Sequence, residues 1–119
     1  MHGPLVMAYM GDNIYEKYVR EYLINKGITK VGELQNESLN YVSAKSQRKH
    51  LERLMDNNFL TEEEIEIVKS GRNAKGTKSK STDIITYRLA TGLECLIGTL
   101  YFSKKEKRIE EIMKFILGE

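Results

Sequence analysis

Two acidic residues stand in apolar surroundings, and acids of this kind can hold a metal ion. Glu94 is the only charged residue between Arg88 and Lys104, within the stretch LATGLECLIGTLYF. A helix that is apolar around most of its circumference is mostly buried, and a buried carboxylate is costly unless it is paired or bound to a metal. Asp12 is the first acidic residue of the chain and follows the apolar LVMAYMG. Carboxylate ligands select hard cations, which here predicts Mg²⁺ or Mn²⁺.

A purely structural interpretation of the two acids stays open. Asp12 could cap a kinked helix, and Glu94 could pair with a buried arginine such as Arg20 or Arg88.

Glu16 follows Asp12 by four residues, which places both carboxylates on one face of a helix. Like charges at this spacing repel each other, and a divalent cation would relieve the repulsion.

Glycines accompany both acids. Gly92 and Gly98 lie on either side of Glu94, and Gly11 directly precedes Asp12. Glycine in a helix interior is disfavoured by about 1 kcal/mol relative to alanine, so it usually marks a place where another backbone approaches closely. The sequence therefore predicts that Glu94 points into a crowded space between helices.

The elements that must position these acids are predicted to be helices. Apolar spacings of three and four residues favour helices at about 5–26, 36–57, 61–70, 83–102 and 103–117. Thr61 with Glu64, and Ser103 with Glu106, have the spacing of capping boxes. The stripe expected to be buried in the second helix comprises Leu39, Val42, Leu51, Leu54 and Met55. No segment alternates with period two for long enough to predict a strand, so the expected fold class is all-α.

The net charge of +2 is unevenly distributed along the chain. Residues 69–82 hold five basic residues and no acid, whereas the rest has 14 basic and 17 acidic residues. Residues 71–81 (GRNAKGTKSKS) lack apolar periodicity and are expected to form a mobile loop. A basic island on a mildly acidic body suggests contact with a polyanion. A solvated lysine-rich loop that only links two helices is the alternative.

Composition limits the remaining possibilities. A chain of 119 residues is expected to form one domain. The single cysteine, Cys95, excludes an internal disulfide and lies in an apolar run, which favours a core residue over a nucleophile. The sequence contains no stretch typical of a transmembrane helix and no basic region ahead of its first apolar run. These features favour a reducing, cytoplasmic compartment.

The residues around both acids resemble a known family. AYMGDNIYE with Gly11–Asp12, and LECLIG at residues 93–98, are similar to the two helical signatures of the ribonuclease III endonuclease domain. In that family the signature glutamate precedes Ala-Leu-Ile-Gly, and here Cys95 replaces the alanine. The stretches NYVSAKSQ, FLTEEE, GRNAK and TDIITYRLATGLECLIGTLY resemble, in the same order, Mini-ribonuclease III, the small bacterial branch that lacks the double-stranded-RNA-binding domain.

The sequence departs from full-length ribonuclease III at two acidic positions. Ala8 stands where that family has a glutamate four residues before the aspartate, and Thr91 stands where it has an aspartate three residues before the glutamate. The Mini-ribonuclease branch shares this reduced set. The resemblance therefore assigns catalysis and metal binding to Asp12 and Glu94, and Glu16 could supplement them.

The resemblance implies hydrolysis of double-stranded RNA by a symmetric homodimer with Mg²⁺, leaving 5′-phosphate and 3′-hydroxyl ends. The implied substrate is the precursor of large-subunit (23S) ribosomal RNA. Without a separate RNA-binding domain, the duplex backbone is expected to meet Arg72, Asn73, Lys75, Lys78 and Lys80. Lys45 and Gln47 are also expected to bind RNA, nearer the catalytic site. Tyr15, Tyr18 and Tyr22 could belong to a dimer interface or to the core.

Two other functions stay possible at this point. A non-catalytic RNA-binding or ribosome-assembly module could have kept the same fold. A helical interaction protein with no nucleic-acid role is the second alternative.

Overall fold

The computed structural model describes residues 2–75 and 83–118. These residues form six helices and no strand, which confirms the all-α class. The helices are α1 Pro4–Asn25, α2 Val31–Val42, α3 Ala44–Asp56, α4 Glu62–Asn73, α5 Ile84–Phe102 and α6 Glu106–Leu117. None of the helices in the described residues is long and apolar enough to cross a lipid bilayer.

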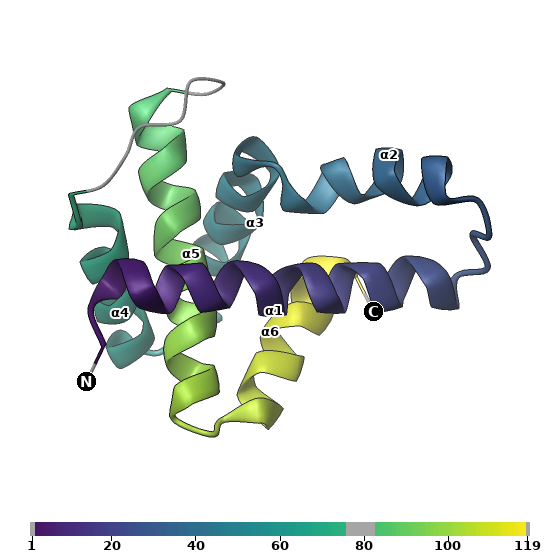
Figure 1. Ribbon diagram of the computed structural model, residues 1–119. Helices are drawn as coiled ribbons and strands as arrows, with labels where there is room; N and C mark the ends of the chain where they lie inside the picture. The colour runs from purple at the N-terminus through teal and green to yellow at the C-terminus, as the bar shows by residue number, and fades with distance from the viewer. Residues whose placement is uncertain (1, 76–82, 119) are drawn as a thin grey trace.

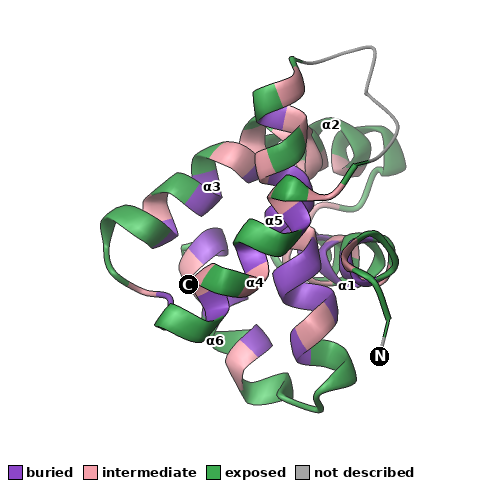
Figure 2. Cartoon of the chain, turned by 90° about the vertical axis from the view of Figure 1, so that its left-hand side faces the viewer, coloured by how far each residue is buried: buried purple, intermediate pink, exposed green. Residues whose placement is uncertain are grey.

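Helix α5 is the centre of the molecule, and its buried surface runs along most of its length (Figure 2). Helices α1, α3, α4 and α6 all pack against it. Helix α1 crosses α5 at a steep angle, and its second half extends beyond the body beside α2 (Figure 1). More than half of the α5 residues are buried, because small or apolar side chains lie all around this helix. Any polar group in the middle of α5 is therefore surrounded by neighbouring helices.

Glycines allow two helices to approach α5 closely, as the sequence predicted for Gly92 and Gly98. At the α1 crossing, a Cβ on Gly11 would overlap the Glu94 carbonyl, and a Cβ on Gly98 would overlap the Met7 carbonyl. At the α4 crossing, a Cβ on Gly92 would lie 2.8 Å from the Val68 carbonyl oxygen. Backbone atoms cannot rotate away from such contacts, so these glycines fix how near α1 and α4 lie to α5.

The predicted helix at 36–57 is wrong, because two helices meet at Ser43. Ser43 has an extended backbone (φ −66°, ψ 153°), and its hydroxyl accepts a hydrogen bond from the Ser46 amide at 3.2 Å, which caps α3. The apolar stripe is also only partly buried. Leu51 and Leu54 lie in the core, whereas Leu39 and Met55 are exposed. The break turns α3 toward α5 and leaves α2 with no buried residue.

The other helix ends differ from the prediction by a few residues. The Thr61–Glu64 capping box is present, but α4 continues through Gly71 to Asn73, so the predicted loop begins later than residue 71. Ser103 does not begin α6, because its amide donates to the Thr99 carbonyl at 3.0 Å and ends α5. Residues 76–82 of the predicted loop lie outside the described residues.

An ion pair joins α4 to α6 on the side of the capping box. Arg108 donates to both carboxylate oxygens of Glu64 at 2.8 Å and to the Phe59 carbonyl at 2.6 Å. Burial raises the pKa of Glu64, but hydrogen bonds from Arg108 and from the Thr61 backbone outweigh it and leave the pKa below its usual value. The buried carboxylate is therefore satisfied without a metal.

Tyr15, Tyr18 and Tyr22 of α1 lie in the core or pack against it. Tyr15 is fully buried, and its hydroxyl donates to the Tyr41 carbonyl at 2.8 Å. Tyr18 and Tyr22 are half-buried against the same core cluster. Cys95 is buried beneath α4, as predicted, and burial raises the pKa of its thiol. A raised thiol pKa is the opposite of what a nucleophilic cysteine requires.

Candidate active site

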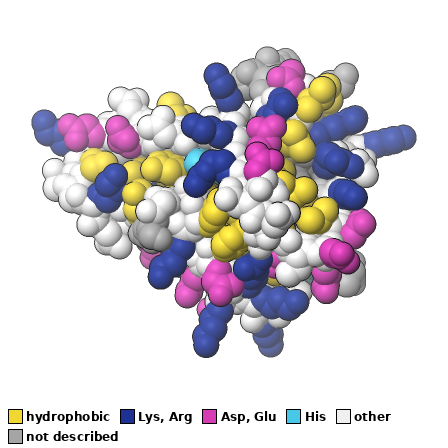
Figure 3. All heavy atoms as spheres, turned by 180° about the vertical axis from the view of Figure 1, so that it is seen from behind, with side chains coloured by type: hydrophobic (Ala, Val, Ile, Leu, Met, Phe, Trp, Pro, Cys, Tyr) yellow, Lys and Arg dark blue, Asp and Glu magenta, His cyan; other side chains and the backbone are white. Residues whose placement is uncertain are grey.

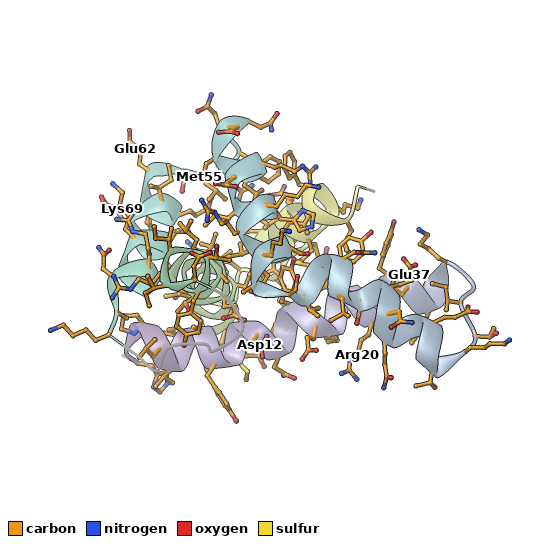
Figure 4. All side chains as sticks on the ribbon, turned by 90° about the horizontal axis from the view of Figure 1, so that it is seen from above. Asp12, Arg20, Glu37, Met55, Glu62 and Lys69 are labelled. Atoms are coloured by element: carbon orange, nitrogen blue, oxygen red, sulfur yellow. The ribbon has the colours of Figure 1, made fainter. Side chains whose placement is uncertain are left out.

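The crossing of α1 and α5 brings Asp12 and Glu94 together from positions 82 residues apart in the sequence. Asp12 lies in the middle of α1, beside α5, which Figure 4 shows nearly end-on. Both side chains line a cavity of about 310 Å³ that also includes Leu5, Ala8, Tyr9, Tyr87 and Thr91. Asp12 is exposed and Glu94 is half-buried. Asp12 is thus the more accessible of the two acids to solvent.

The two carboxylates interact strongly. Burial, followed by hydrogen bonding to Asp12 and by its negative charge, raises the pKa of Glu94 to about 8. The hydrogen bond from the Gln47 amide lowers the pKa of Glu94, and the negative charge of Glu16 raises it further. A carboxyl group held in this way binds a proton near neutral pH, and a divalent cation at the same place would replace that proton.

The fold does not support the alternative in which Asp12 caps a helix and Glu94 pairs with a buried arginine. Asp12 is in the helix interior and caps no helix end. Arg20 lies farther along α1 and pairs with Glu16 at 3.7 Å (Figure 4). No lysine, arginine or histidine of residues 2–75 and 83–118 lies within 4.0 Å of the Glu94 carboxylate. Arg88 is exposed on α5. The Glu94 carboxylate therefore has no cationic partner in the described part of the chain.

The two positions that differ from full-length ribonuclease III line the same cavity. Ala8 lies one turn before Asp12 on α1, and Thr91 lies nearly one turn before Glu94 on α5. The Thr91 hydroxyl donates to the Tyr87 carbonyl at 2.9 Å, so it serves the helix backbone. No group of three or more acidic, histidine or cysteine side chains suited to a metal occurs in the described residues. The cavity therefore offers two carboxylates.

Comparison with known proteins identifies the family. Residues 5–105 match the ribonuclease III domain. The chain belongs to the ribonuclease III family. It is 47% identical to the Mini-ribonuclease 3 of Staphylococcus aureus, over 97% of this chain and 87% of the relative. It is 51% identical to the Mini-ribonuclease 3 of Brevibacillus brevis, over 94% of this chain and 83% of the relative.

A solved structure agrees with this assignment. The crystal structure of a Fusobacterium nucleatum protein superimposes with a TM-score of 0.87 at 32% sequence identity. The match covers 98% of this chain and 93% of the other. Members of the ribonuclease III family are endoribonucleases, and the resemblance that was drawn from the two signatures and from the ordered stretches is confirmed.

The described side chains that are expected to contact RNA lie near the start of α3 and around the end of α4. Lys45 is exposed near the start of α3, and Lys75 is exposed beyond α4. Arg72 and Asn73 end α4, where the Arg72 guanidinium donates to the Asn73 amide oxygen at 3.2 Å. Lys78 and Lys80 lie outside the described residues. On the face opposite to the one seen in Figure 1, basic and acidic side chains are interspersed (Figure 3).

Gln47 is placed differently from the other expected RNA contacts. It is only 2% exposed, and its amide donates to the Glu94 carboxylate at 3.4 Å. The sequence predicts Gln47 as an RNA contact near the catalytic site, and the burial of its side chain does not favour contact with RNA. A signal for the buried position was present, because Gln47 shares a helix face with Leu51 and Leu54 at spacings of four and seven residues.

Proposed function

We propose that this endoribonuclease cleaves double-stranded RNA with a divalent cation held by Asp12 and Glu94. The observation that carries the proposal is the pair of carboxylates in one cavity, where burial and the neighbouring Asp12 raise the pKa of Glu94 to about 8 and the described residues supply no cationic partner. Mg²⁺ is commonly held by one or two carboxylates and keeps several waters or takes phosphate oxygens. Two acids in an open cavity fit that pattern, and Mn²⁺ has the same ligand preference.

The chemistry of the site follows from its residues. A bound divalent ion lowers the pKa of a coordinated water and stabilises the leaving oxygen of a phosphodiester. Asp12, the more exposed acid, would hold the ion where it can also take an oxygen of the scissile phosphate, and Glu94 would complete the ligand set. Attack of water at phosphorus with departure of the 3′ oxygen leaves a 5′-phosphate and a 3′-hydroxyl. Lys45 and Lys75, both exposed, would neutralise neighbouring phosphates.

We propose a symmetric homodimer, in which the site of each protomer cuts one strand of the duplex. An apolar surface on the first turns of α1 supports it. Leu5, Val6 and Tyr9 are 38%, 53% and 84% exposed, and Leu5 and Tyr9 also border the cavity. Aromatic side chains are enriched in protein interfaces. Sedimentation should give a dimer, and Tyr9→Ser should shift it toward monomer.

The substrate we propose is the precursor of 23S ribosomal RNA, and the cytoplasm is the compartment where a bacterial precursor would be met. The test incubates the protein with the precursor, with matched duplex RNA and with either strand alone, in Mg²⁺ or in EDTA. The proposal predicts cuts in paired RNA only, dependent on Mg²⁺, with 5′-phosphate ends. RNA binding without cleavage under all conditions would instead support the non-catalytic module.

A further inference from the structure

Gln47 is a buried polar side chain in the face of α3 that packs on α5. It is 2% exposed, and Leu51 and Leu54 on the same face are in the core. An apolar side chain of similar size would fill this place without the cost of burying an amide. Buried amides are kept where their hydrogen bonds are used, so the partner of Gln47 indicates its role.

That partner is the carboxylate proposed to bind the metal. The Gln47 Nε2 donates to Glu94 Oε2 at 3.4 Å, a long bond that orients the carboxylate without neutralising it. A lysine at this place would neutralise Glu94 and compete with a cation. An apolar residue would leave the glutamate free to rotate about its side-chain torsions. A neutral amide donor restricts the rotation and keeps the negative charge available.

The fold holds the Gln47 backbone rigidly opposite Glu94. Ser43 caps α3 one turn before Gln47, and the backbone N–H of Gln47 donates to the Ser43 carbonyl at 2.9 Å. The neighbouring Arg48 donates to the Thr86 hydroxyl on α5 at 2.9 Å. This second contact fixes the register of α3 against α5 two turns away from Glu94, so the amide position does not depend on Glu94 itself.

We propose that Gln47 is a positioning residue, which orients the Glu94 carboxylate for divalent-metal binding and does not contact the RNA. The inference rests on the proposed function of Asp12 and Glu94 as metal ligands. It reassigns Gln47 from the set of RNA contacts, in which Lys45 remains on the exposed side of the same helix. Groups that hydrogen-bond metal ligands typically change metal affinity or activity by about 10–100-fold when they are replaced.

The test measures Mn²⁺ binding by calorimetry without RNA, duplex affinity in EDTA, and cleavage kinetics in Mg²⁺. Gln47→Met removes the donor at similar volume and should weaken Mn²⁺ binding about 10–100-fold. It should lower kcat while leaving duplex affinity and the KM for RNA unchanged. Two matched controls separate the roles. Lys49→Met changes an exposed side chain of the same helix and should leave Mn²⁺ affinity unchanged, and Lys45→Met should weaken duplex binding only.

Each outcome is decisive for Gln47. If Gln47→Met binds Mn²⁺ like the wild type, or loses duplex affinity as Lys45→Met does, the inference is wrong while the proposed function stands. A Gln47→Met protein that is unfolded at the assay temperature would make Gln47 a residue of the core and also overturn the inference. If the wild-type protein binds no Mn²⁺ at all, the proposed metal site itself fails.

Discussion

Replacing Gly98 by alanine should force α1 and α5 apart. The added Cβ would overlap the Met7 carbonyl and lie 3.1 Å from the Gly11 nitrogen. Both atoms belong to the backbone of α1, so neither can move without moving the helix. The substitution therefore acts directly on the crossing that holds Asp12 beside Glu94.

The expected cost follows from two opposing effects. Alanine is preferred over glycine in a helix interior by about 1 kcal/mol, which would stabilise the variant. Overpacking typically costs about 1–3 kcal/mol, and a clash with backbone belongs at or above the upper end. A net loss of about 2 kcal/mol should lower the Tm of a chain of 119 residues by about 8 °C. A displacement near 1 Å at the site should reduce cleavage about 100-fold.

The assay combines thermal unfolding with cleavage of duplex RNA well below the Tm of the variant. Gly32→Ala is the matched control, because Gly32 lies in α2 and an added Cβ meets no atom within 4 Å. It should keep or raise the Tm and retain cleavage. A Gly98→Ala protein with the Tm and the cleavage rate of the wild type would refute the close helix crossing.

Three further predictions concern pH, packing and RNA. Between pH 4.5 and about 8 the folded protein keeps a proton on Glu94 that the unfolded chain has lost, so metal-free stability should fall as pH rises. Asp12→Asn should flatten this dependence in thermal melts with EDTA, and an unchanged slope would contradict it. Arg108→Met strands the buried Glu64 carboxylate and should cost about 3 kcal/mol in urea unfolding, with Mn²⁺ affinity kept; an unshifted midpoint would oppose this. Replacing three lysines of the basic segment with alanine should flatten the slope of log affinity against log salt by about 2–3. Replacing three lysines between the end of α5 and the first turn of α6 should not. The two sets are Lys75, Lys78 and Lys80, and Lys104, Lys105 and Lys107.

The sequence was sufficient where a local pattern and the tertiary fold agree. The central helix could be predicted because the run around Glu94 is apolar on nearly every side. Gly92 and Gly98 predicted close backbone contacts because a glycine in a helix interior needs a packing reason. The meeting of Asp12 with Glu94 depends on a helix crossing far along the chain, and spacing alone could not give it. The family resemblance supplied that pairing.

Helix ends were less predictable, because two local signals compete at the same residue. Ser103 and Glu106 have the spacing of a capping box, yet the Ser103 amide is used to end α5. Lys104 then adopts a left-handed backbone with φ 60°, and α6 begins at Glu106. At Ser43, apolar residues on both sides extend one helical pattern across a break that only the cap geometry reveals.

The most direct test of the account is cleavage of duplex RNA in Mg²⁺ by the wild type, Asp12→Asn and Glu94→Gln at equal folded concentration. Both substitutions keep the size of the side chain and remove a carboxylate from the cavity. The account predicts cleavage by the wild type, and losses in each variant greater than the roughly 100-fold typical of residues that only support a metal site. Duplex binding in EDTA should be retained by both variants. Cleavage by either variant at the wild-type rate would contradict the account.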